Sequence, residues 1–291
     1  ALLDANGYQQ MMSLDHITAD LFAPGRSLQA LNAGQDEMQF RACTTLQEVS
    51  ARIDAGAGRT APLFVQMRTL DLHISSLSDR SQASRPAYGG FHPAAADRVA
   101  RIDACIGQFL ERLKTQGLYD DSLVVVTSDH GDALGEAQRW GHAYTLFPEI
   151  IRVPLLVHVP ARLRQAWSTD TDAAVFSTDL VPSLYALLGY PVREDNPIAG
   201  RPFYVRPGTD TSWRRRAAVV LASSYGSVYG VLRNNGTDLF IADAVNGRDY
   251  AYNLRDLTPR RVAVTMEGRA AGRGWIAQTL SEIQAPHERA K

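Results

Sequence analysis

The 291-residue sequence predicts an α/β fold: a mixed, mostly parallel sheet flanked by helices, followed by a small antiparallel sheet with a closing helix. Two observations predict the α/β layer. The β-branched run Leu123–Thr127 is typical of a strand buried on both faces, and a long helical pattern precedes it at residues 94–116. The third observation is a change after Arg206 to short strand-like runs separated by Gly and Asn turns. We therefore expect two domains, residues 1–205 and residues 206–291.

The N-terminal part of the sequence predicts two short helices and one strand. The segment Ala1–Tyr8 favours a helix that ends at Gly7, and Thr45–Ile53 favours a second helix. The stretch between them is polar and turn-rich, and it indicates no regular element. Leu63–Thr69 is an apolar run directly after Pro62, which is typical of a strand.

The central part has the spacing of a βαβ unit. The predicted helix at 94–116 carries its apolar residues at the helical period, and Gly117 is a natural stop. Leu123–Thr127 and Pro154–Val159 are strand patterns separated by residues 128–153. Such a separation is typical of two strands joined by a helix and its connections.

The C-terminal part predicts one helix, a set of hairpins and a closing helix. Asp179–Leu188 has an acidic start and Pro182 in its first turn, both of which are helix-start signals. The strings NNG at 234–236 and NG at 246–247 are typical of β-hairpin turns. The expected strands are Ala217–Ala222, Ser227–Arg233, Asp238–Ala242 and Asp249–Leu254, and the expected closing helix is Gly274–Ile283.

Composition excludes several classes of protein. The 30 basic and 31 acidic residues nearly balance, which argues against a general nucleic-acid binder. The sequence contains no apolar run of about 18 residues that would span a membrane, and its first twenty residues lack a signal-peptide pattern. Cys43 and Cys105 are too few for a disulfide scaffold and lack metal-type spacing. Because only Lys114 and Lys291 are lysines among the basic residues, we expect high-GC, bacterial coding.

The chemistry is expected where the strand Leu123–Thr127 ends, because ligands of open α/β sheets bind at the carboxyl edge. Asp129 and His130 follow there, and Gly131 supplies the backbone freedom that lets both side chains serve one site. A carboxylate and an imidazole suit a divalent cation such as Ca²⁺, Mn²⁺ or Zn²⁺. The alternative interpretation is a turn with a capping aspartate and a solvated histidine.

A wider pattern decides between these interpretations. The order SDHGxxLGE, then WGHxxTLFxExxRVPLLVxxP, resembles the sulfatase family of the alkaline-phosphatase superfamily. The resemblance extends upstream to FVQMRTLDLHISS and downstream to FSTDLVPSLYALLGYP, GRPF and YNLRDLTP, so it covers most of residues 60–260. It implies an alkaline-phosphatase-like fold and an ester-cleaving enzyme.

The resemblance also implies roles for single residues. Asp129 and His130 match metal ligands, with Ca²⁺ expected first and Mn²⁺, Mg²⁺ or Zn²⁺ as alternatives. His142 matches a basic residue that contacts the anionic oxygens of the ester, although capping or packing beside Trp140 is an alternative. His73 matches a histidine that reaches the leaving group or the oxyanion, but its flanking residues depart from the family's D-P-H-x-P-Y pattern. Positioned cations and donors lower the barrier of such reactions.

The family's nucleophile motif, C/S-x-P-x-R, is not found in the sequence. Cys43 and Cys105 lack the motif, and the string at 22–26 places Phe22 where the nucleophile belongs. We therefore expect either a chain that starts after its nucleophile or a degenerate relative. In the first case a missing N-terminal segment or an oligomer partner is expected to cover the sheet edges.

The leading hypothesis is a metal-dependent hydrolase of sulfate or phosphate esters that works through a covalent intermediate on a nucleophile not visible in this chain. The expected substrate is a small-molecule or glycan ester, with specificity in the loops at 75–93 and 194–208. The alternatives are a phospho-head-group transferase of the same superfamily and a catalytically inactive binding module. The family favours a periplasmic, extracellular or membrane-anchored protein over a cytoplasmic one.

Overall fold

The computed structural model describes residues 2–15, 28–56, 58, 60–73, 93–190, 200–256 and 258–289. The chain forms two compact units. The first comprises residues 1–120 and 134–140, and the second comprises residues 121–133 and 141–291. The predicted α/β class with a small antiparallel sheet and a C-terminal helix is confirmed. The domain boundary at residue 205 stays a prediction.

A three-stranded parallel sheet lies in the first unit, with strand order β2-β1-β3. The strands are β1 (Gln9–Ser13), β2 (Leu28–Leu31) and β3 (Leu63–Gln66). β3 confirms the strand predicted at Leu63–Thr69, whereas β1 and β2 lie in stretches where no strand was expected. The reason is physical: QQMMS and LQAL contain no β-branched residue, and pairing and burial stabilise them as strands.

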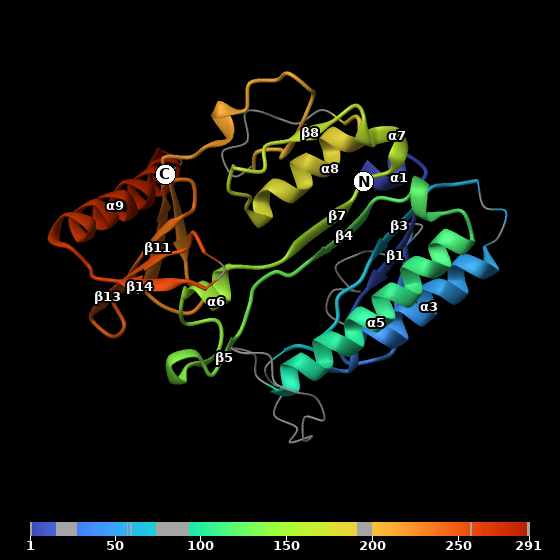
Figure 1. Cartoon of the computed structure of the whole chain (residues 1–291), viewed down its shortest axis with the longest axis horizontal. Helices are drawn as coiled ribbons and strands as arrows, with labels where there is room; N and C mark the ends of the chain where they lie inside the picture. The colour runs from blue at the N-terminus through green and yellow to red at the C-terminus, as the bar shows by residue number, and fades with distance from the viewer. Residues whose placement is uncertain are drawn as a thin grey trace. The chain divides into compact units, whose positions relative to one another are not determined.

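Two helices pack beside this sheet, as Figure 1 shows: α3 (Ala42–Ala55) and α5 (Pro93–Thr115). Val49 of α3 is fully buried together with Met11 and Leu31 of the sheet. Both predicted helices are confirmed, and α3 is longer at each end than predicted. A single-turn helix, α1 (Leu2–Ala5), begins the chain.

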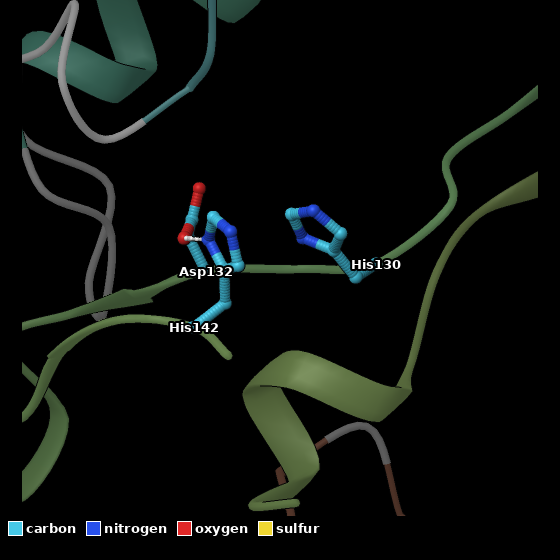
Figure 2. A group of neighbouring side chains, drawn as sticks. All are labelled: His130, Asp132 and His142. Carbon is cyan, nitrogen blue, oxygen red and sulfur yellow. Dashed lines mark hydrogen bonds and ion pairs between the residues drawn. The ribbon is translucent and has the colours of Figure 1, made fainter. Parts of the chain in front are cut away.

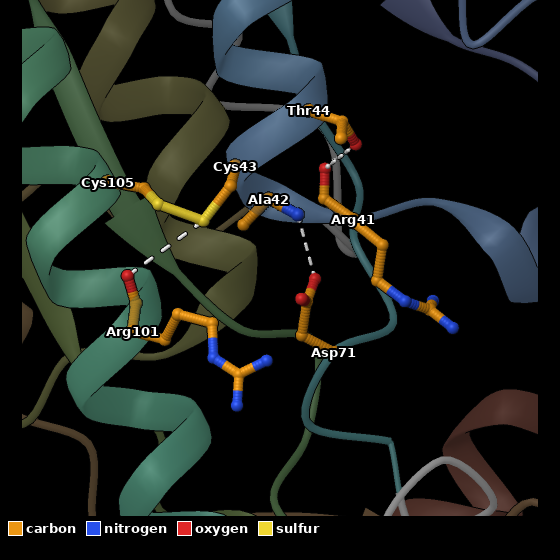
Figure 3. Close-up of a disulfide and its surroundings, with 7 residues drawn as sticks. All are labelled: Arg41, Ala42, Cys43, Thr44, Asp71, Arg101 and Cys105. Carbon is orange, nitrogen blue, oxygen red and sulfur yellow. Dashed lines mark hydrogen bonds between the residues drawn. A yellow bond between two sulfur atoms is a disulfide. The ribbon is translucent and has the colours of Figure 1, made fainter.

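Cys43 of α3 and Cys105 of α5 form a disulfide across 62 residues of sequence, with their Cα atoms 5.3 Å apart (Figure 3). The sequence correctly indicates that two cysteines make no scaffold, but it does not predict this single bond. Cysteine spacing alone carries no information on which helix faces meet, so the pair is visible only in the folded unit.

The second unit begins with the strands β4 (Val124–Thr127) and β7 (Leu155–His158), which pair antiparallel. The expected βαβ unit is therefore wrong for this pair. In the fully described residues 128–153 the only α-helix is α6 (Pro148–Ile151), a single turn. Antiparallel neighbours need no crossover helix, so the long connection is available for site residues instead.

The helix α8 (Leu180–Leu188) confirms the prediction at Asp179–Leu188, with Pro182 in its first turn. Asp179 directly precedes it and is fully buried, where its carboxylate accepts from the Arg216 guanidinium at 2.8 Å. Gly200 allows a close approach of two backbone segments, since a Cβ there would lie 2.0 Å from the Thr178 carbonyl oxygen. The short elements of the chain are β5 (Ala133–Leu134), β6 (Trp140–Gly141), α7 (Ala161–Arg164), β8 (Ser168–Thr169) and β9 (Tyr204–Val205).

The C-terminal sheet of the second unit has five antiparallel strands in sequence order. One face packs on Leu146 and Phe147, and the other packs on Ile276 of the closing helix (Figure 1). The predicted hairpin turns are confirmed, with Asn234 and Asn235 in left-handed conformation. The elements are β10 (Ala218–Ala222), β11 (Val228–Arg233), β12 (Asp238–Asp243), β13 (Arg248–Asn253), β14 (Arg260–Val262) and α9 (Met266–Arg289).

The closing helix α9 begins at Met266, earlier than the Gly274 that the sequence predicts. Its Gly272 lies against Phe240, where an added Cβ would come within 2.2 Å of the ring. Close packing on the sheet thus stabilises a segment rich in glycine. Among the described residues, no helix has both the length and the apolar composition that crossing a bilayer requires.

Candidate metal and ester-binding site

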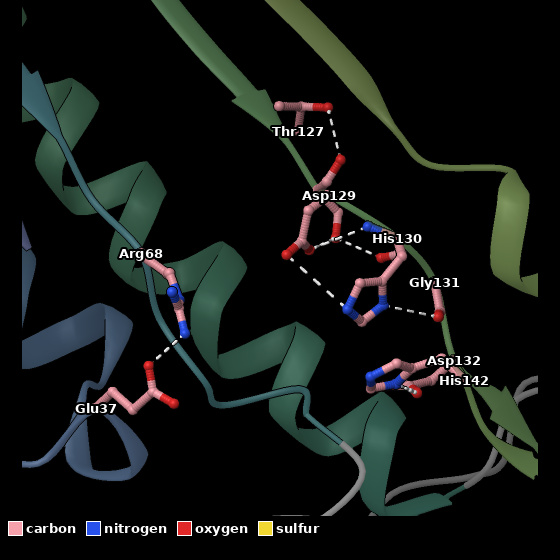
Figure 4. Close-up of polar contacts among 9 residues, drawn as sticks. Glu37, Arg68, Thr127, Asp129, His130, Gly131, Asp132 and His142 are labelled. Carbon is pink, nitrogen blue, oxygen red and sulfur yellow. Dashed lines mark hydrogen bonds and ion pairs between the residues drawn. The ribbon is translucent and has the colours of Figure 1, made fainter. Parts of the chain in front are cut away.

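The predicted site starts where β4 ends, in the tight segment Ser128–Gly131 (Figure 4). Ser128 donates its hydroxyl to the His130 carbonyl at 2.6 Å. The backbone N–H of His130 donates to Oδ1 of Asp129 at 3.0 Å. These local hydrogen bonds break the strand and hold Asp129 and His130 beside each other, as the sequence predicts.

Gly131 determines how this segment sits on the rest of the second unit. Its N–H donates to the Ile150 carbonyl at 2.8 Å, which attaches the segment to α6. A Cβ at position 131 would lie 2.1 Å from the Glu149 carbonyl oxygen, closer than any side chain allows. Only glycine permits this approach, so the backbone that carries His130 and Asp132 is held in place by α6.

Asp129 and His130 have the geometry of a ligand pair. Nε2 of His130 lies 3.9 Å from Oδ2 of Asp129. Nδ1 of His130 lies 3.1 Å from the Gly131 carbonyl oxygen. When Nδ1–H donates to that carbonyl, Nε2 carries the lone pair that a metal ligand needs, which is the usual arrangement of metal-binding histidines. The residues present therefore fit a divalent cation.

His142 is carried by a strained turn after β6. Ala143 has a φ of 79°, the Tyr144 N–H donates to the His142 carbonyl at 3.0 Å, and Ser223 donates to the Ala143 carbonyl at 2.5 Å. Non-glycine residues adopt such a φ only where surrounding contacts enforce it, and they concentrate at functional sites. The turn thus supports the predicted importance of His142.

Asp132 joins the site, although it is not among the predicted residues. Its Oδ1 lies 2.6 Å from Nδ1 of His142, and its side chain is only 11% exposed. This contact orients the imidazole and directs Nε2 away from the carboxylate. The signal that the sequence offers is spacing alone: Asp132 lies two residues after His130, which places both side chains on one face wherever the backbone is extended.

The His130 and His142 rings lie beside each other in Figure 2, with their centroids 3.9 Å apart and their planes inclined by 32°. The structure therefore brings together three side chains from two chain segments, His130, Asp132 and His142. Of the predicted site residues, Asp129, His130 and His142 all belong to this part of the second unit.

His73 belongs to the first unit, where its backbone N–H donates to the Leu70 carbonyl at 3.3 Å. Asp71 holds this turn by accepting from the N–H of Ala42, the first residue of α3, at 2.8 Å (Figure 3). Arg98 of α5 donates to the Asp71 carbonyl at 2.9 Å. The turn that carries His73 is thus attached to both helices, and the catalytic role of His73 stays a prediction.

The structure also decides several secondary predictions. Cys43 and Cys105 are joined in the disulfide, which excludes both as thiol nucleophiles in this state. Arg152 donates to the Asp256 carbonyl at 3.0 Å and so braces a loop. The string at 22–26 lies outside the described residues, as do residues 75–92 and 194–199 of the predicted specificity loops.

In the first unit, Arg68 pairs with Glu37 at 2.5 Å (Figure 4). Both side chains of that pair are substantially exposed. Exposed ion pairs contribute little to stability, so we assign it no role in the site.

Known proteins are similar to parts of this sequence, and solved structures are similar to its fold. The sulfatase family model matches residues 29–190. The N-acetylgalactosamine-6-O-sulfatase of Bacteroides thetaiotaomicron is 25% identical over 151 residues, which are 46% of this chain and 28% of that protein. The low-salt glycan biosynthesis sulfotransferase Agl7 of Haloferax volcanii is 46% identical over 52 residues, 16% of this chain and 13% of that protein.

A solved structure, the lipoteichoic acid synthase LtaP from Listeria monocytogenes, superposes with a TM-score of 0.59 at 14% identity, covering 97% of this chain and 72% of that one. This likeness shows the fold. The chain spans less than a third of the length of the two curated relatives above. Because the family model covers more than half of the 291 residues, the chain belongs to the sulfatase family.

Proposed function

We propose that this protein is a metal-dependent hydrolase of sulfate or phosphate esters that works through a covalent intermediate. The observation that carries the proposal is the juxtaposition of Asp129, His130 and His142 at the end of β4, in a member of the sulfatase family. A carboxylate and two imidazoles at one strand end provide groups both for a cation and for an anionic ester.

Asp129 and His130 would hold the divalent cation, since Oδ2 and Nε2 lie 3.9 Å apart. Ca²⁺ is the first candidate, with Mn²⁺, Mg²⁺ and Zn²⁺ as alternatives. When bound, the cation would stabilise negative charge on the ester oxygens as a Lewis acid.

His142 would donate to an ester oxygen, with Asp132 fixing its tautomer through the 2.6 Å contact to Nδ1. His73 would donate to the leaving group or the oxyanion. A donor near the leaving oxygen lowers the barrier because the departing alkoxide needs a proton. The nucleophile would be neither Cys43 nor Cys105, because both sulfurs are in the disulfide.

The disulfide supports a location outside the cytoplasm. Disulfides persist in oxidising compartments and are rare in reducing ones. A periplasmic, extracellular or membrane-anchored protein is therefore proposed. The substrate would be a small-molecule or glycan ester, and the similarity to a sulfatase named for a 6-O-sulfated sugar supports a sulfated sugar.

The activity test is hydrolysis of an aryl sulfate and an aryl phosphate by the purified protein, with added Ca²⁺ or Mn²⁺. We expect Asp129→Asn to lower kcat/KM by about 100-fold or more, because it removes charge that positions the cation. Asp121→Asn is the matched control, since Asp121 lies in the same unit and is 78% exposed. No hydrolysis of either ester, together with no metal in the purified protein, would contradict the proposal.

A second candidate is a phospho-head-group transferase, which the structural similarity to a lipoteichoic acid synthase favours. It would move phosphoglycerol or phosphoethanolamine from a lipid donor to a glycan or lipid. Supplying such a donor with and without an acceptor separates the two reactions: hydrolysis proceeds with water alone, whereas a transferase needs the acceptor.

A further inference from the structure

The second unit holds a denser set of ligating atoms than the Asp129–His130 pair. His130, Asp132 and His142 each offer one such atom, and these atoms all lie within 4.8 Å of one another (Figure 2). The set is also more sheltered: Asp132 is 11% and His142 is 23% exposed, whereas Asp129 is 82% exposed. Shelter from water strengthens the binding of a cation to its ligands.

We propose that His130, Asp132 and His142 form a binding site for a transition-metal ion of the zinc class. Two imidazoles and one carboxylate are the protein ligands of a common type of zinc site, which keeps a fourth position for water or substrate. Imidazole ligands favour zinc, copper and nickel, whereas Ca²⁺ prefers a set made mostly of oxygen ligands. The donor set therefore selects a nitrogen-preferring ion.

The distances allow one ion to reach all three side chains. Ligands about 2.0–2.2 Å from one tetrahedral ion lie roughly 3.3–3.6 Å from one another. The ligating atoms of His130, Asp132 and His142 all lie within 4.8 Å of one another, so side-chain rotations can bring them to this spacing. The 2.6 Å contact between Asp132 and His142 is shorter than that spacing, so it is a hydrogen bond. A bound ion would lengthen or replace this hydrogen bond.

The backbone around the site is held before any ion binds. Gly131, between His130 and Asp132, is packed against the Glu149 carbonyl in α6. The turn after His142 is held by Ser223, which follows β10. Preorganised ligands lose little conformational entropy on binding, which favours affinity.

This site and the Asp129–His130 pair share His130. One imidazole nitrogen binds one ion at a time. An ion at the three-residue site would therefore make His130 and His142 unavailable for the roles in ester hydrolysis that are proposed above. Zinc is then expected to inhibit the Ca²⁺- or Mn²⁺-supported ester hydrolysis, a consequence that rests on the proposed function. The binding of zinc itself does not depend on any activity.

The test is calorimetric titration of the purified, tag-free protein with Zn²⁺. We expect one ion per chain, with affinity about tenfold or more weaker in Asp132→Asn and in His142→Gln. Asp121→Asn is the matched control and should bind as the unchanged protein does, and Asp129→Asn, which leaves all three proposed ligands in place, should still bind zinc. Unchanged zinc affinity in Asp132→Asn and His142→Gln, or loss of binding in Asp129→Asn, would overturn the proposal.

A second readout guards against misfolded variants. In NMR spectra, Zn²⁺ should shift the ring signals of His130 and His142 and leave those of His73 and His158 in place. Asp132→Glu keeps a carboxylate and should restore part of the affinity lost in Asp132→Asn. Ring shifts at His73 or His158 without shifts at His142 would show that zinc binds elsewhere and would overturn the site.

Discussion

The two units hold their candidate site residues by different means. In the first unit, the turn that carries His73 is attached to α3 and α5, and the Cys43–Cys105 disulfide links those helices covalently. In the second unit, His130 and His142 are held by tight backbone packing and by side-chain hydrogen bonds. The fully buried Asp179 anchors the chain around α8 in that unit.

The difference predicts which change destabilises each unit, a change of solution conditions or a substitution. A covalent link between helices is insensitive to salt and pH but is lost on reduction. A buried carboxylate depends on its cation partner and hydrogen bonds, because removing a partner leaves a desolvated group unsatisfied. We therefore expect the first unit to respond to redox conditions and the second to respond to substitution of its polar groups.

The largest effect is expected at Asp179, which accepts from Arg216 and from the backbone N–H groups of Arg201 and Phe176. Asp179→Ala should lower the free energy of unfolding of the second unit by about 3–5 kcal/mol, since it leaves the Arg216 guanidinium, only 17% exposed, without its carboxylate partner. Urea unfolding followed by tryptophan fluorescence measures it. The control, Asp121→Ala, removes an exposed carboxylate and should change stability by less than about 1 kcal/mol. Equal effects of the two substitutions would contradict the anchoring role.

Replacing Cys43 and Cys105 with serine should destabilise the first unit by about 2–4 kcal/mol, because the bond closes a loop of 62 residues. Thermal unfolding with and without dithiothreitol measures the effect. The reductant should lower the melting temperature of the unchanged protein and leave that of the double variant as it is. A melting temperature insensitive to reductant in both would contradict the disulfide's contribution.

Gly131→Ala and Gly107→Ala compare the same change in the two units. The first places a Cβ 2.1 Å from the Glu149 carbonyl and should destabilise the second unit by about 1–3 kcal/mol. Gly107 lies within α5 with no atom near its Cβ position, so alanine there should stabilise the first unit by about 0.5–1 kcal/mol. Opposite signs in urea unfolding are expected, and a shared sign would show that the packing at Gly131 relaxes.

The smallest destabilisation is expected at Asp71, whose carboxylate accepts from the first N–H of α3. Asp71→Ala should cost about 1 kcal/mol, as does the loss of a helix cap. Hydrogen exchange at Ala42 should accelerate in this variant. Asp71→Asn keeps an acceptor oxygen and is the control. Unchanged exchange in Asp71→Ala would show that water replaces the carboxylate.

Elements with strong local signals could be predicted from the sequence. α5 follows from its apolar period, and the hairpins of β11 to β13 follow from NNG and NG turns. β1 could not be predicted, because QQMMS has no strand propensity and becomes a strand only between two partners. The same holds for the antiparallel pairing of β4 with β7, since strand direction depends on where the chain returns.

The site divides in the same way. Asp129, His130 and His142 could be predicted from their motif, because a motif is defined by residue types and their spacing along the chain. The contact between Asp132 and His142 could not be predicted, because it depends on the turn after β6 that brings the two side chains to 2.6 Å.

The sequence by itself determined the family and the α/β fold class, since ordered motifs indicate the family and local periodicities indicate the helices and strands. Tertiary structure alone decided the Cys43–Cys105 bond and the meeting of His130, Asp132 and His142. The physical reason is that these contacts join residues distant in sequence, and their distances depend on how packed elements face each other.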